Sequence, residues 1–587
     1  MISGASQQSS EQPVSSGRRK LFGLILILIV CLPMLLTELG LRTIGKPLPY
    51  DPYIHFGQID SFFSRQSADG TDYYQVASRE VYRERQVKFA GVKPPNTFRI
   101  FCLGGSASAG WPHPENEIYS AYLQQALAHA YPDRRIEVIN VSAHAYAAYR
   151  VRFILQEVIN FDPDLIVIYS GNNEFIERRT YKTVADWTDP VLDLAKHSAI
   201  FRRFRGSSFA RRFFPDNTLS ADEREHVRYE QWSKIERLAL KLRHDPAQFA
   251  FVKAHYAYSL TSMAQIAKEK GVPVILVTVP VNLRDWHPNV SDQPLDGDRM
   301  ARWLDAYREG RAHLLRHDFS TAVRSLEAAA ALSPTHAETQ FYLGHAHEEL
   351  SHFSEALRRY DLARDLDRNP FRAISEFNSI VKEVAAHEQA TYLADAEVAF
   401  HAASKPFAPG FDLFLDYVHP TTKGNRLVAA TVFNTILEHR LIPGNPTSQR
   451  FETQGTENAQ QDHAYEEHRD QALQGMMVRL FVMMHQYQGA LDKSRLLVEM
   501  KHPIGEIREK DIGLAQDVLR LFPQLLSLES DEIAGHRVDA ARRAQIQSDL
   551  HAFYAQHFPG YNEFRIQREL DEKQAYSAPQ RFTRASP

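Results

Sequence analysis

A serine, an aspartate and a histidine have the types and spacing that nucleophilic catalysis needs in this chain of 587 residues. Ser106 lies within the glycine-rich stretch GGSASAG at 104–110, and Asp416 precedes His419 by three residues. A carboxylate at that spacing can fix the tautomer of the histidine and stabilise the imidazolium that forms when the ring takes a proton from serine. The pattern predicts acyl transfer through a serine ester, a chemistry that requires no cofactor.

Each of these signals has a competing interpretation. A glycine-rich turn can cradle phosphate, but no lysine follows this one and its spacing fits neither phosphate-binding pattern. Alone, such a turn is more often structural than catalytic. A D-x-x-H pair can also ligate a metal, or lie on the surface without a function. No other candidate segment supplies an Asp/His cluster for the remaining ligands, so we predict no metal site.

Two further polar segments complete the candidate site. The first, NVSAHA, spans 140–145, and the second, GNNE, spans 171–174. A backbone N–H from the first and a side-chain amide from the second could point at one oxyanion beside the serine. His144 is interpreted as a loop residue rather than a base, because no carboxylate near it in the sequence could orient its ring.

The elements that must position these segments follow an alternating pattern of strands and helices. Short apolar runs rich in Val, Ile and Leu predict strands, and the stretches between them predict helices. The predicted strands are 97–103, 136–140, 165–170, 272–280 and 391–394, and the predicted helices are 118–130, 149–160 and 222–270. The pattern predicts a parallel sheet, with polar segments just past the carboxyl ends of its strands.

The order and placement of the four segments resemble the SGNH (GDSL) hydrolase family over residues 97–440. The resemblance implies a three-layer α/β/α fold of the flavodoxin type. It further implies that Ser106 is the nucleophile, that Asp416 and His419 complete the triad, and that Gly110 is the glycine of the first family block. An α/β-hydrolase is disfavoured because position 108 is serine, which breaks the G-x-S-x-G motif.

The resemblance also implies an oxyanion hole, formed by the backbone N–H groups of Ser106 and Ala145 and the side-chain amide of Asn173. The sequence departs from the family pattern at three positions. Gly105 and Glu174 each replace an aspartate, and Ala145 replaces a glycine. Only the last has a direct catalytic role. Alanine keeps the N–H donor, so we expect the hole to survive if the φ angle there is negative.

The segment VPVNLRD at 279–285 is similar to the corresponding loop of SGNH members that carry tetratricopeptide repeats. Asn282, Arg284 and Asp285 are therefore predicted to bind substrate. A loop held by its own salt bridge is an alternative of at least equal weight.

An internal repeat interrupts the predicted sheet domain. Five positions in one unit recur 34 residues later: Gly310, Phe319, Ala322, Leu326 and Ala329 correspond to Gly344, Phe353, Ala356, Tyr360 and Ala363. The period resembles the tetratricopeptide repeat. We therefore predict an insertion at 301–370 between domain parts 97–300 and 371–442. The repeats are a candidate site for a protein partner, and a generic helical hairpin is the alternative.

The remaining segments are described by composition. Residues 1–20 form a polar and basic leader, 42–96 a connector, 443–462 a linker, 463–576 a helical appendage and 577–587 a disordered tail. The balance of 72 acidic against 68 basic residues, a net charge of −4, gives no basic surface for nucleic acid.

Residues 21–41 are predicted to be a membrane anchor. The uncharged run 21–36 is about 24 Å long as a helix and extends to 41 if Glu38 snorkels. A basic cluster precedes it and no A-x-A cleavage site follows, which favours an uncleaved signal anchor with a cytoplasmic N-terminus. A cleaved signal peptide and a buried core helix are the alternatives. Cys31 then lies in the membrane and Cys102 alone outside it, so no disulfide forms in the exported part.

Together these features predict a membrane-anchored, extracytoplasmic serine esterase, periplasmic in a Gram-negative cell. Its expected substrate is an acylated, for example acetylated, envelope or extracellular polysaccharide, an expectation drawn from location and family analogy. Three alternatives stay open: an O-acyltransferase with the same triad, a catalytically weak scaffold protein, and a phospholipase or thioesterase.

Overall fold

The computed structural model describes Ile25, Ile29 and residues 31–40, 62–68, 71–76, 87–176, 246–292, 295–451, 470–500, 509–534 and 536–559. The chain divides into two units, one of residues 1–60 and 179–218 and one of residues 61–178 and 219–587. In the first unit, residues 31–40 are helical. Residues 21–24, 26–28, 30 and 41 of the predicted anchor lie outside the described residues. None of the described helices has the length and apolar character needed to cross a membrane.

A parallel sheet of five strands forms the centre of the second unit, in the order β5-β4-β6-β7-β8. The strands are β4 (Thr97–Gly104), β5 (Arg135–Asn140), β6 (Leu165–Tyr169), β7 (Val274–Val277) and β8 (Thr391–Ala394). Numbered along the chain within this sheet, the order is 2-1-3-4-5, that of flavodoxin-like folds. The predicted strands are confirmed, except that β7 is shorter than 272–280. It begins directly after Pro273, which has no N–H to donate to the ladder.

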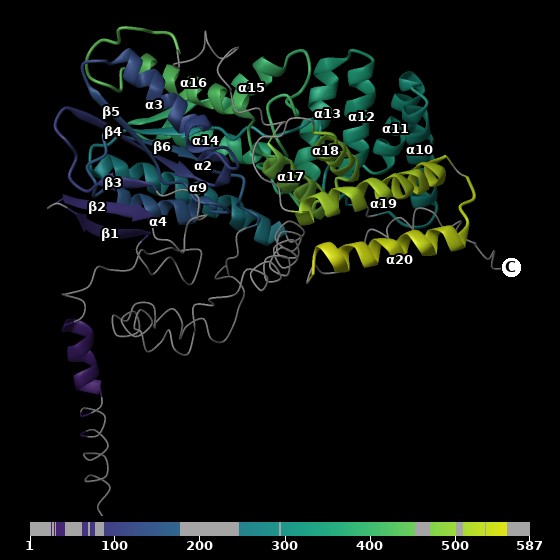
Figure 1. Ribbon diagram of the computed structural model, residues 1–587, viewed down its shortest axis with the longest axis horizontal. Helices are drawn as coiled ribbons and strands as arrows, with labels where there is room; N and C mark the ends of the chain where they lie inside the picture. Colours follow the sequence, from purple (N-terminus) through teal and green to yellow (C-terminus); the bar gives the residue numbers. More distant parts are fainter. Residues whose placement is uncertain are drawn as a thin grey trace, which may run out of the picture. The chain divides into compact units, whose positions relative to one another are not determined.

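Helices cover both faces of this sheet, as predicted for a three-layer fold (Figure 1). One layer contains α3 (Tyr119–Ala130) and α16 (Thr422–Glu438), which contact each other. The other contains α4 (Ala148–Val158), α9 (Pro246–Glu269) and α14 (Ser375–His387), where α9 contacts both of its neighbours. The side chains of β4 and β6 are buried throughout, as expected for strands enclosed by helices. Burial also raises the pKa of the Cys102 thiol on β4 to about 12, so this thiol stays neutral.

A small antiparallel sheet occupies part of the predicted connector 42–96. It consists of β1 (Phe63–Ala68), β2 (Thr71–Val76) and β3 (Lys88–Ala90), in that order. Phe63 and Phe89 pack edge-on against each other and against Phe161, with ring centroids 5.1 to 5.5 Å apart. The sequence did not predict these strands, because two of them carry mostly polar residues.

Two helical hairpins form the insertion. They are α10 (Gly297–Leu315) with α11 (Phe319–Leu332), and α12 (Ala337–Glu349) with α13 (Phe353–Leu366). The repeated glycines lie where paired helices cross: a Cβ at Gly310 would come within 2.5 Å of Leu326, and one at Gly344 within 2.7 Å of Tyr360. The assignment of these hairpins to the tetratricopeptide family stays a prediction.

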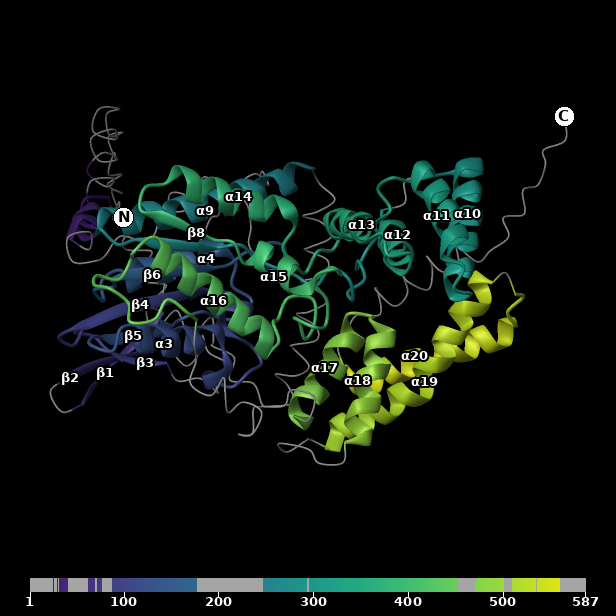
Figure 2. The ribbon, with the colours of Figure 1, turned by 90° about the horizontal axis from the view of Figure 1, so that it is seen from above.

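A third hairpin of the same form lies in the C-terminal appendage, formed by α17 (Gln471–Met483) and α18 (Tyr487–Glu499). In all three hairpins a turn of three residues joins the helices, and its middle residue is left-handed: His317, Ser351 and His485, with φ of 59°, 61° and 56°. The sequence did not reveal it because Val478 stands where the other two hairpins have the crossing glycine. Figure 2 shows the three hairpins as separate pairs of helices.

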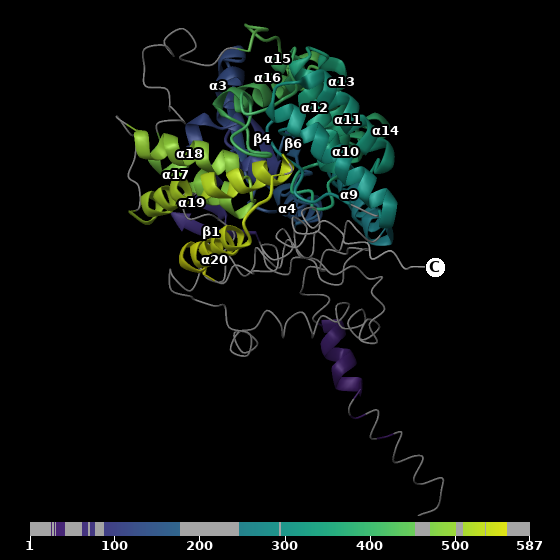
Figure 3. The ribbon, with the colours of Figure 1, turned by 90° about the vertical axis from the view of Figure 1, so that its right-hand side faces the viewer.

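Two longer helices, α19 (Glu509–Ile533) and α20 (Ala540–His557), follow this hairpin in the described part of the appendage. The first contacts α17, α18 and also α10 of the insertion, as Figure 3 shows from the side. Arg311 on α10 lies 3.7 Å from Glu529 on α19 and stacks over the ring of Tyr342. The appendage therefore packs against the repeats. The predicted tail 577–587 and residues 452–462 of the predicted linker lie outside the described residues.

Candidate active site

Ser106, His419 and Asp416 form a continuous chain of hydrogen bonds at the carboxyl edge of the sheet. His419 Nε2 is 2.8 Å from Ser106 Oγ, and His419 Nδ1 is 2.6 Å from Asp416 Oδ2. Asp416 is fully buried and His419 is 6% exposed, whereas Ser106 is half-buried. With Nδ1–H donating to the carboxylate, Nε2 accepts the proton of the serine hydroxyl. The structure thus brings together three residues from two segments more than 300 positions apart.

A tight loop presents the acid and the base from one turn. The other carboxylate oxygen of Asp416, Oδ1, accepts hydrogen bonds from the backbone N–H groups of Val418 and His419, both at 2.8 Å. The loop closes where the N–H of Leu415 donates to the carbonyl of His419. An aspartate three residues before the histidine therefore shapes the loop as well as orienting the ring.

The nucleophile lies at the first position of a short helix, α2 (Ser106–Ala109), directly after β4. Its own N–H has no acceptor within the helix at this position and can donate to a ligand. Gly105 caps the helix, and a Cβ at that position would lie 2.2 Å from Asn173 Nδ2. A side chain at position 105 would displace this amide. The glycine instead allows the amide of Asn173 to lie against the backbone next to the serine.

Asn173 is buried, and its orientation is fixed by the neighbouring loop. Its Nδ2 donates to the carbonyl of Tyr146 at 3.1 Å. An amide nitrogen carries two hydrogens, so the second remains for an oxyanion beside Ser106. This contact joins the segment 171–174 to the loop directly after the segment 140–145, as expected for segments that were predicted to converge.

The condition set on the backbone of Ala145 is not met. Its φ is +59°, in the left-handed region, and not negative. Alanine keeps its N–H donor at either sign of φ, so the place of Ala145 in the oxyanion hole stays a prediction. Left-handed backbone costs a residue with a Cβ about 1–2 kcal/mol. The loop therefore has a backbone angle that glycine adopts without strain, whereas alanine adopts it at this cost in conformational free energy. Ala145 precedes Tyr146, whose carbonyl holds Asn173, so the strained residue lies next to the oxyanion side of the site.

Glu174, the second departure from the family pattern, is buried at the start of a helix. Its Oε1 accepts the N–H of Ala148, the first residue of α4, at 2.8 Å. A carboxylate at a helix N-terminus satisfies a free donor and complements the helix dipole. The longer side chain thus anchors the loop that contains Ala145.

The loop after β7 supports the acid–base loop. Asn282 is fully buried, donates from Nδ2 to the carbonyl of Asp416 at 3.0 Å, and accepts the N–H of Asp285 at 3.0 Å. Arg284 pairs with Asp285 at 3.1 Å and with Asp412 at 3.5 Å. These contacts match the alternative of a salt-bridged loop. Contact of Asn282, Arg284 or Asp285 with substrate stays a prediction.

Two residues missed by sequence reasoning join the nucleophile side to the acid–base loop. His113 is buried, and its Nε2 donates to the carbonyl of Pro420 at 2.7 Å. Asn425 on α16 accepts the N–H of Tyr119 at 3.1 Å. The only signal for His113 in the sequence is its position, seven residues after the serine.

The segment after the repeats and the appendage both contact residues that support the acid–base loop. Arg372, which follows the second hairpin, donates to the carbonyl of Asn282. Trp286 packs against Tyr417 at 5.0 Å between ring centroids, and Phe481 of α17 packs against Trp286 at 5.1 Å. Two side chains, those of Trp286 and Tyr417, therefore separate Phe481 of the third hairpin from the triad residue Asp416.

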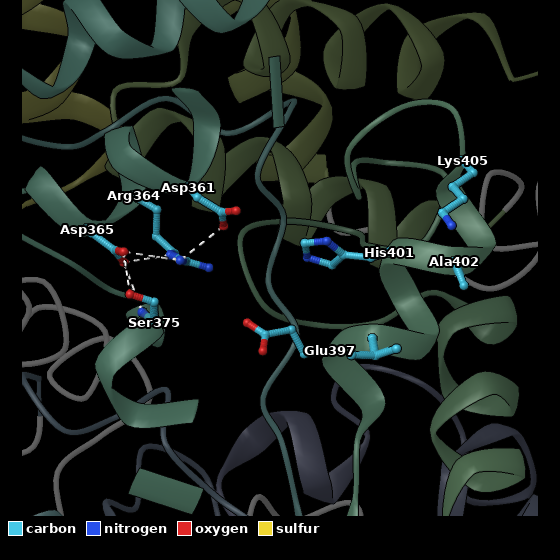
Figure 4. Close-up of a pocket in the computed structure, with 9 residues that line it drawn as sticks. Asp361, Arg364, Asp365, Ser375, Glu397, His401, Ala402 and Lys405 are labelled. Carbon is cyan, nitrogen blue, oxygen red and sulfur yellow. Dashed lines mark hydrogen bonds and ion pairs between the residues drawn. The ribbon is translucent and has the colours of Figure 1, made fainter. Parts of the chain in front are cut away.

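A polar pocket of about 490 Å³ lies between α13, α14 and α15 (Ala396–Ser404), and no triad residue lines it. Figure 4 shows Arg364 paired with Asp361 and Asp365, while Glu397 and His401 extend from α15 into the same space. Burial raises the pKa of Asp361 and lowers that of His401. Because Arg364 offsets the two aspartates, the pocket does not present a concentrated negative charge.

The comparisons with known proteins found no matching family model and no match among curated proteins. Among solved structures, the chain is similar to an acetylxylan esterase from Geobacillus stearothermophilus, with 14% identity, a TM-score of 0.27, and coverage of 58% of this chain and 94% of that one. It is also similar to an alpha/beta hydrolase from the metagenome of Lake Arreo, with 12% identity, a TM-score of 0.26 and coverage of 58% and 94%.

A GDSL-like lipase from Bacteroides thetaiotaomicron is similar as well, with 12% identity, a TM-score of 0.24 and coverage of 58% and 88%. At such identities and TM-scores, the activity of this chain has to be argued from its own residues.

Proposed function

We propose that this protein is a serine esterase of the SGNH type that acts through an acyl-enzyme. The observation that carries the proposal is the position of His419 between Ser106 Oγ at 2.8 Å and the buried carboxylate of Asp416 at 2.6 Å. These two bonds place a nucleophile, a general base and an orienting carboxylate in the order that acyl transfer needs.

The reaction proceeds in two halves. His419 Nε2 takes the proton of Ser106 as Oγ attacks the acyl carbonyl, and the side chain of Asn173 with the N–H groups of Ser106 and Ala145 stabilises the oxyanion. The imidazolium, stabilised by Asp416, then gives its proton to the leaving alcohol as the ester C–O bond breaks. Water, deprotonated by His419, attacks the acyl-enzyme, and the acid departs as Ser106 regains its proton.

The proposed substrate is an acylated polysaccharide of the envelope or the cell exterior. This part rests on the N-terminal sequence, whose basic cluster and apolar run support an anchor with the catalytic unit outside the cytoplasm. A fusion of alkaline phosphatase after residue 96 tests it in a Gram-negative host. Phosphatase activity is expected, and its absence together with a stable fusion would contradict the location.

Transfer of the acyl group to a sugar hydroxyl is the second candidate, because it uses the same triad. It differs only in which hydroxyl group accepts the acyl group from Ser106. Hydrolysis of p-nitrophenyl acetate, measured with and without a glycan acceptor, separates the two. Free acetate as the main product supports the esterase, and acetylated glycan as the main product supports the transferase.

The test of the triad uses the full-length protein in detergent, with Ser106→Ala and His419→Ala as variants. We expect both kcat values to fall by roughly 10³-fold or more, and by similar factors, because triad members act as a unit. Exposed Val92→Ala serves as the unchanged control. Activity that survives in Ser106→Ala would refute the mechanism, and inactivity of the wild type would favour the scaffold alternative.

A further inference from the structure

Trp111 lies directly against the catalytic base. Its ring centroid is 4.5 Å from that of His419, and the ring planes meet at 60°. The indole is half-buried, so part of it remains accessible to a ligand, whereas His419 is buried. No sequence motif singled out this residue.

The segment that carries Trp111 is held from both sides. The backbone N–H of Trp111 donates to the carbonyl of Ser106 at 3.1 Å, and that of His113 donates to Gly110 at 2.9 Å. The side chain of His113 then bonds to the carbonyl of Pro420 at 2.7 Å. The indole is therefore fixed before a substrate arrives, which lowers the entropic cost of binding against it.

The reaction places the leaving alcohol beside this indole. Its oxygen must come within about 3 Å of His419 Nε2 to receive a proton. The acyl group is bonded to Ser106, and its carbonyl oxygen faces Asn173, on the other side of the reacting carbon. Because the alcohol oxygen must reach the histidine against which the indole packs, the alcohol is the part of the substrate that this contact places beside Trp111.

We infer that Trp111 is a specificity-determining residue whose indole packs against the ring of a sugar alcohol. A rigid aromatic face offers a large contact area to the C–H groups of a pyranose, while the sugar hydroxyls stay in water. The inference rests on the proposed esterase function and names the part of the substrate that the site selects. A small alcohol such as ethanol is too short to gain from this contact.

The test compares two acetate esters that differ only in the alcohol, acetylated methyl glucoside and ethyl acetate. The full-length protein is assayed as wild type, Trp111→Ala and Trp111→Phe. Tyr73→Leu is the matched control, because Tyr73 is also half-buried but lies on β2 of the small sheet, where its ring contacts Lys88. For the sugar ester we expect KM to rise about tenfold in Trp111→Ala and less in Trp111→Phe. For ethyl acetate we expect kcat/KM to stay within about twofold.

Each other outcome overturns a defined part of the account. An equal loss for both esters would mean that the indole only supports His419, and an unchanged KM for the sugar ester would remove it from the substrate site. Butyrylated methyl glucoside, assayed beside the acetate, varies the acyl chain alone, and a loss in Trp111→Ala that grows with acyl length would assign the indole to the acyl chain. If the wild type hydrolyses neither ester, the proposed function fails and the inference fails with it.

Discussion

The two halves of the candidate site are built in different ways. The triad half consists of Ser106, His419 and Asp416, held by side-chain hydrogen bonds of 2.6 and 2.8 Å. The oxyanion half consists of Asn173 and the loop at Ala145. It depends on the left-handed backbone of Ala145 and on the hydrogen bond from the Asn173 amide to the carbonyl of Tyr146. All three departures from the family pattern lie in or next to this second half. The triad half therefore requires three particular side chains. The oxyanion half requires donors at particular positions, which residues of other types can also supply.

The largest effect should follow from a change in the triad half. In Asp416→Asn the side chain keeps its size, but its amide favours the wrong tautomer of His419, and kcat should fall about 10⁴-fold. KM should change little, because Asp416 does not reach the substrate. Steady-state kinetics measure both values, with Asp412→Asn as a control on the same loop. A drop of less than tenfold would mean that His419 does not depend on this carboxylate.

A change in the oxyanion half should cost less. Asn173→Ala removes one donor of the proposed hole, and kcat should fall about 10²- to 10³-fold. Asn172, its neighbour, accepts the N–H of Ala373 at 3.0 Å and lies outside the proposed hole, so Asn172→Ala tests for a general disturbance of the loop. An equal loss in both variants would contradict a specific role for Asn173.

A smaller effect, on stability, is expected at Glu348, which lies beside the loop that supports the triad half. Glu348 on α12 has an unpartnered buried oxygen, and burial raises its pKa to about 7 in the folded protein, beside Arg284 and Asp285. In the unfolded chain the carboxyl group ionises near pH 4.5, so the folded state holds the extra proton between these values. The free energy of unfolding should therefore fall as the pH rises from about 4.5 to about 7.

Glu348→Gln should remove this dependence and stabilise the protein above pH 7 by about 1 kcal/mol, allowing for partial solvent screening. Denaturant unfolding at several pH values measures the change, with the exposed neighbour Glu349→Gln as control. Parallel pH curves for Glu348→Gln and the wild type would contradict the assignment.

The smallest effect should come from relieving the strain in the oxyanion half. Ala145→Gly fits the left-handed angle without a Cβ, and the gain is partly offset by the greater freedom of glycine in the unfolded chain. We expect the free energy of unfolding to rise by about 0.5–1 kcal/mol and kcat to stay within about twofold, because the N–H donor is kept. Ala143→Gly in the same loop should instead destabilise the protein. A loss of activity in Ala145→Gly would mean that the Cβ itself matters.

The sequence predicted the features that depend on residue type and period. The strands followed from their apolar runs, and the convergence of Ser106 with Asp416 and His419 followed from the placement of polar segments after strands. The third hairpin was not predicted because Val478 replaces a crossing glycine, although its turn has the same left-handed geometry at His485. The positive φ of Ala145 was not predicted because alanine seldom adopts such an angle.

Contacts made by backbone atoms or through long loops could not be predicted. His113 reaches the carbonyl of Pro420 across 307 positions, and nothing in the local sequence marks that pairing. The indole of Trp111 lies against His419 for the same reason, since the fold brings two distant loops together.

Labelling of the nucleophile tests the central claim most directly. The full-length protein is treated with a fluorophosphonate probe, which reacts with activated serines, and the modified peptide is identified by mass spectrometry. One adduct is expected, on Ser106; it should be absent in Ser106→Ala and form much more slowly in His419→Ala. An adduct on another serine, or an active esterase in which Ser106 stays unmodified, would contradict it.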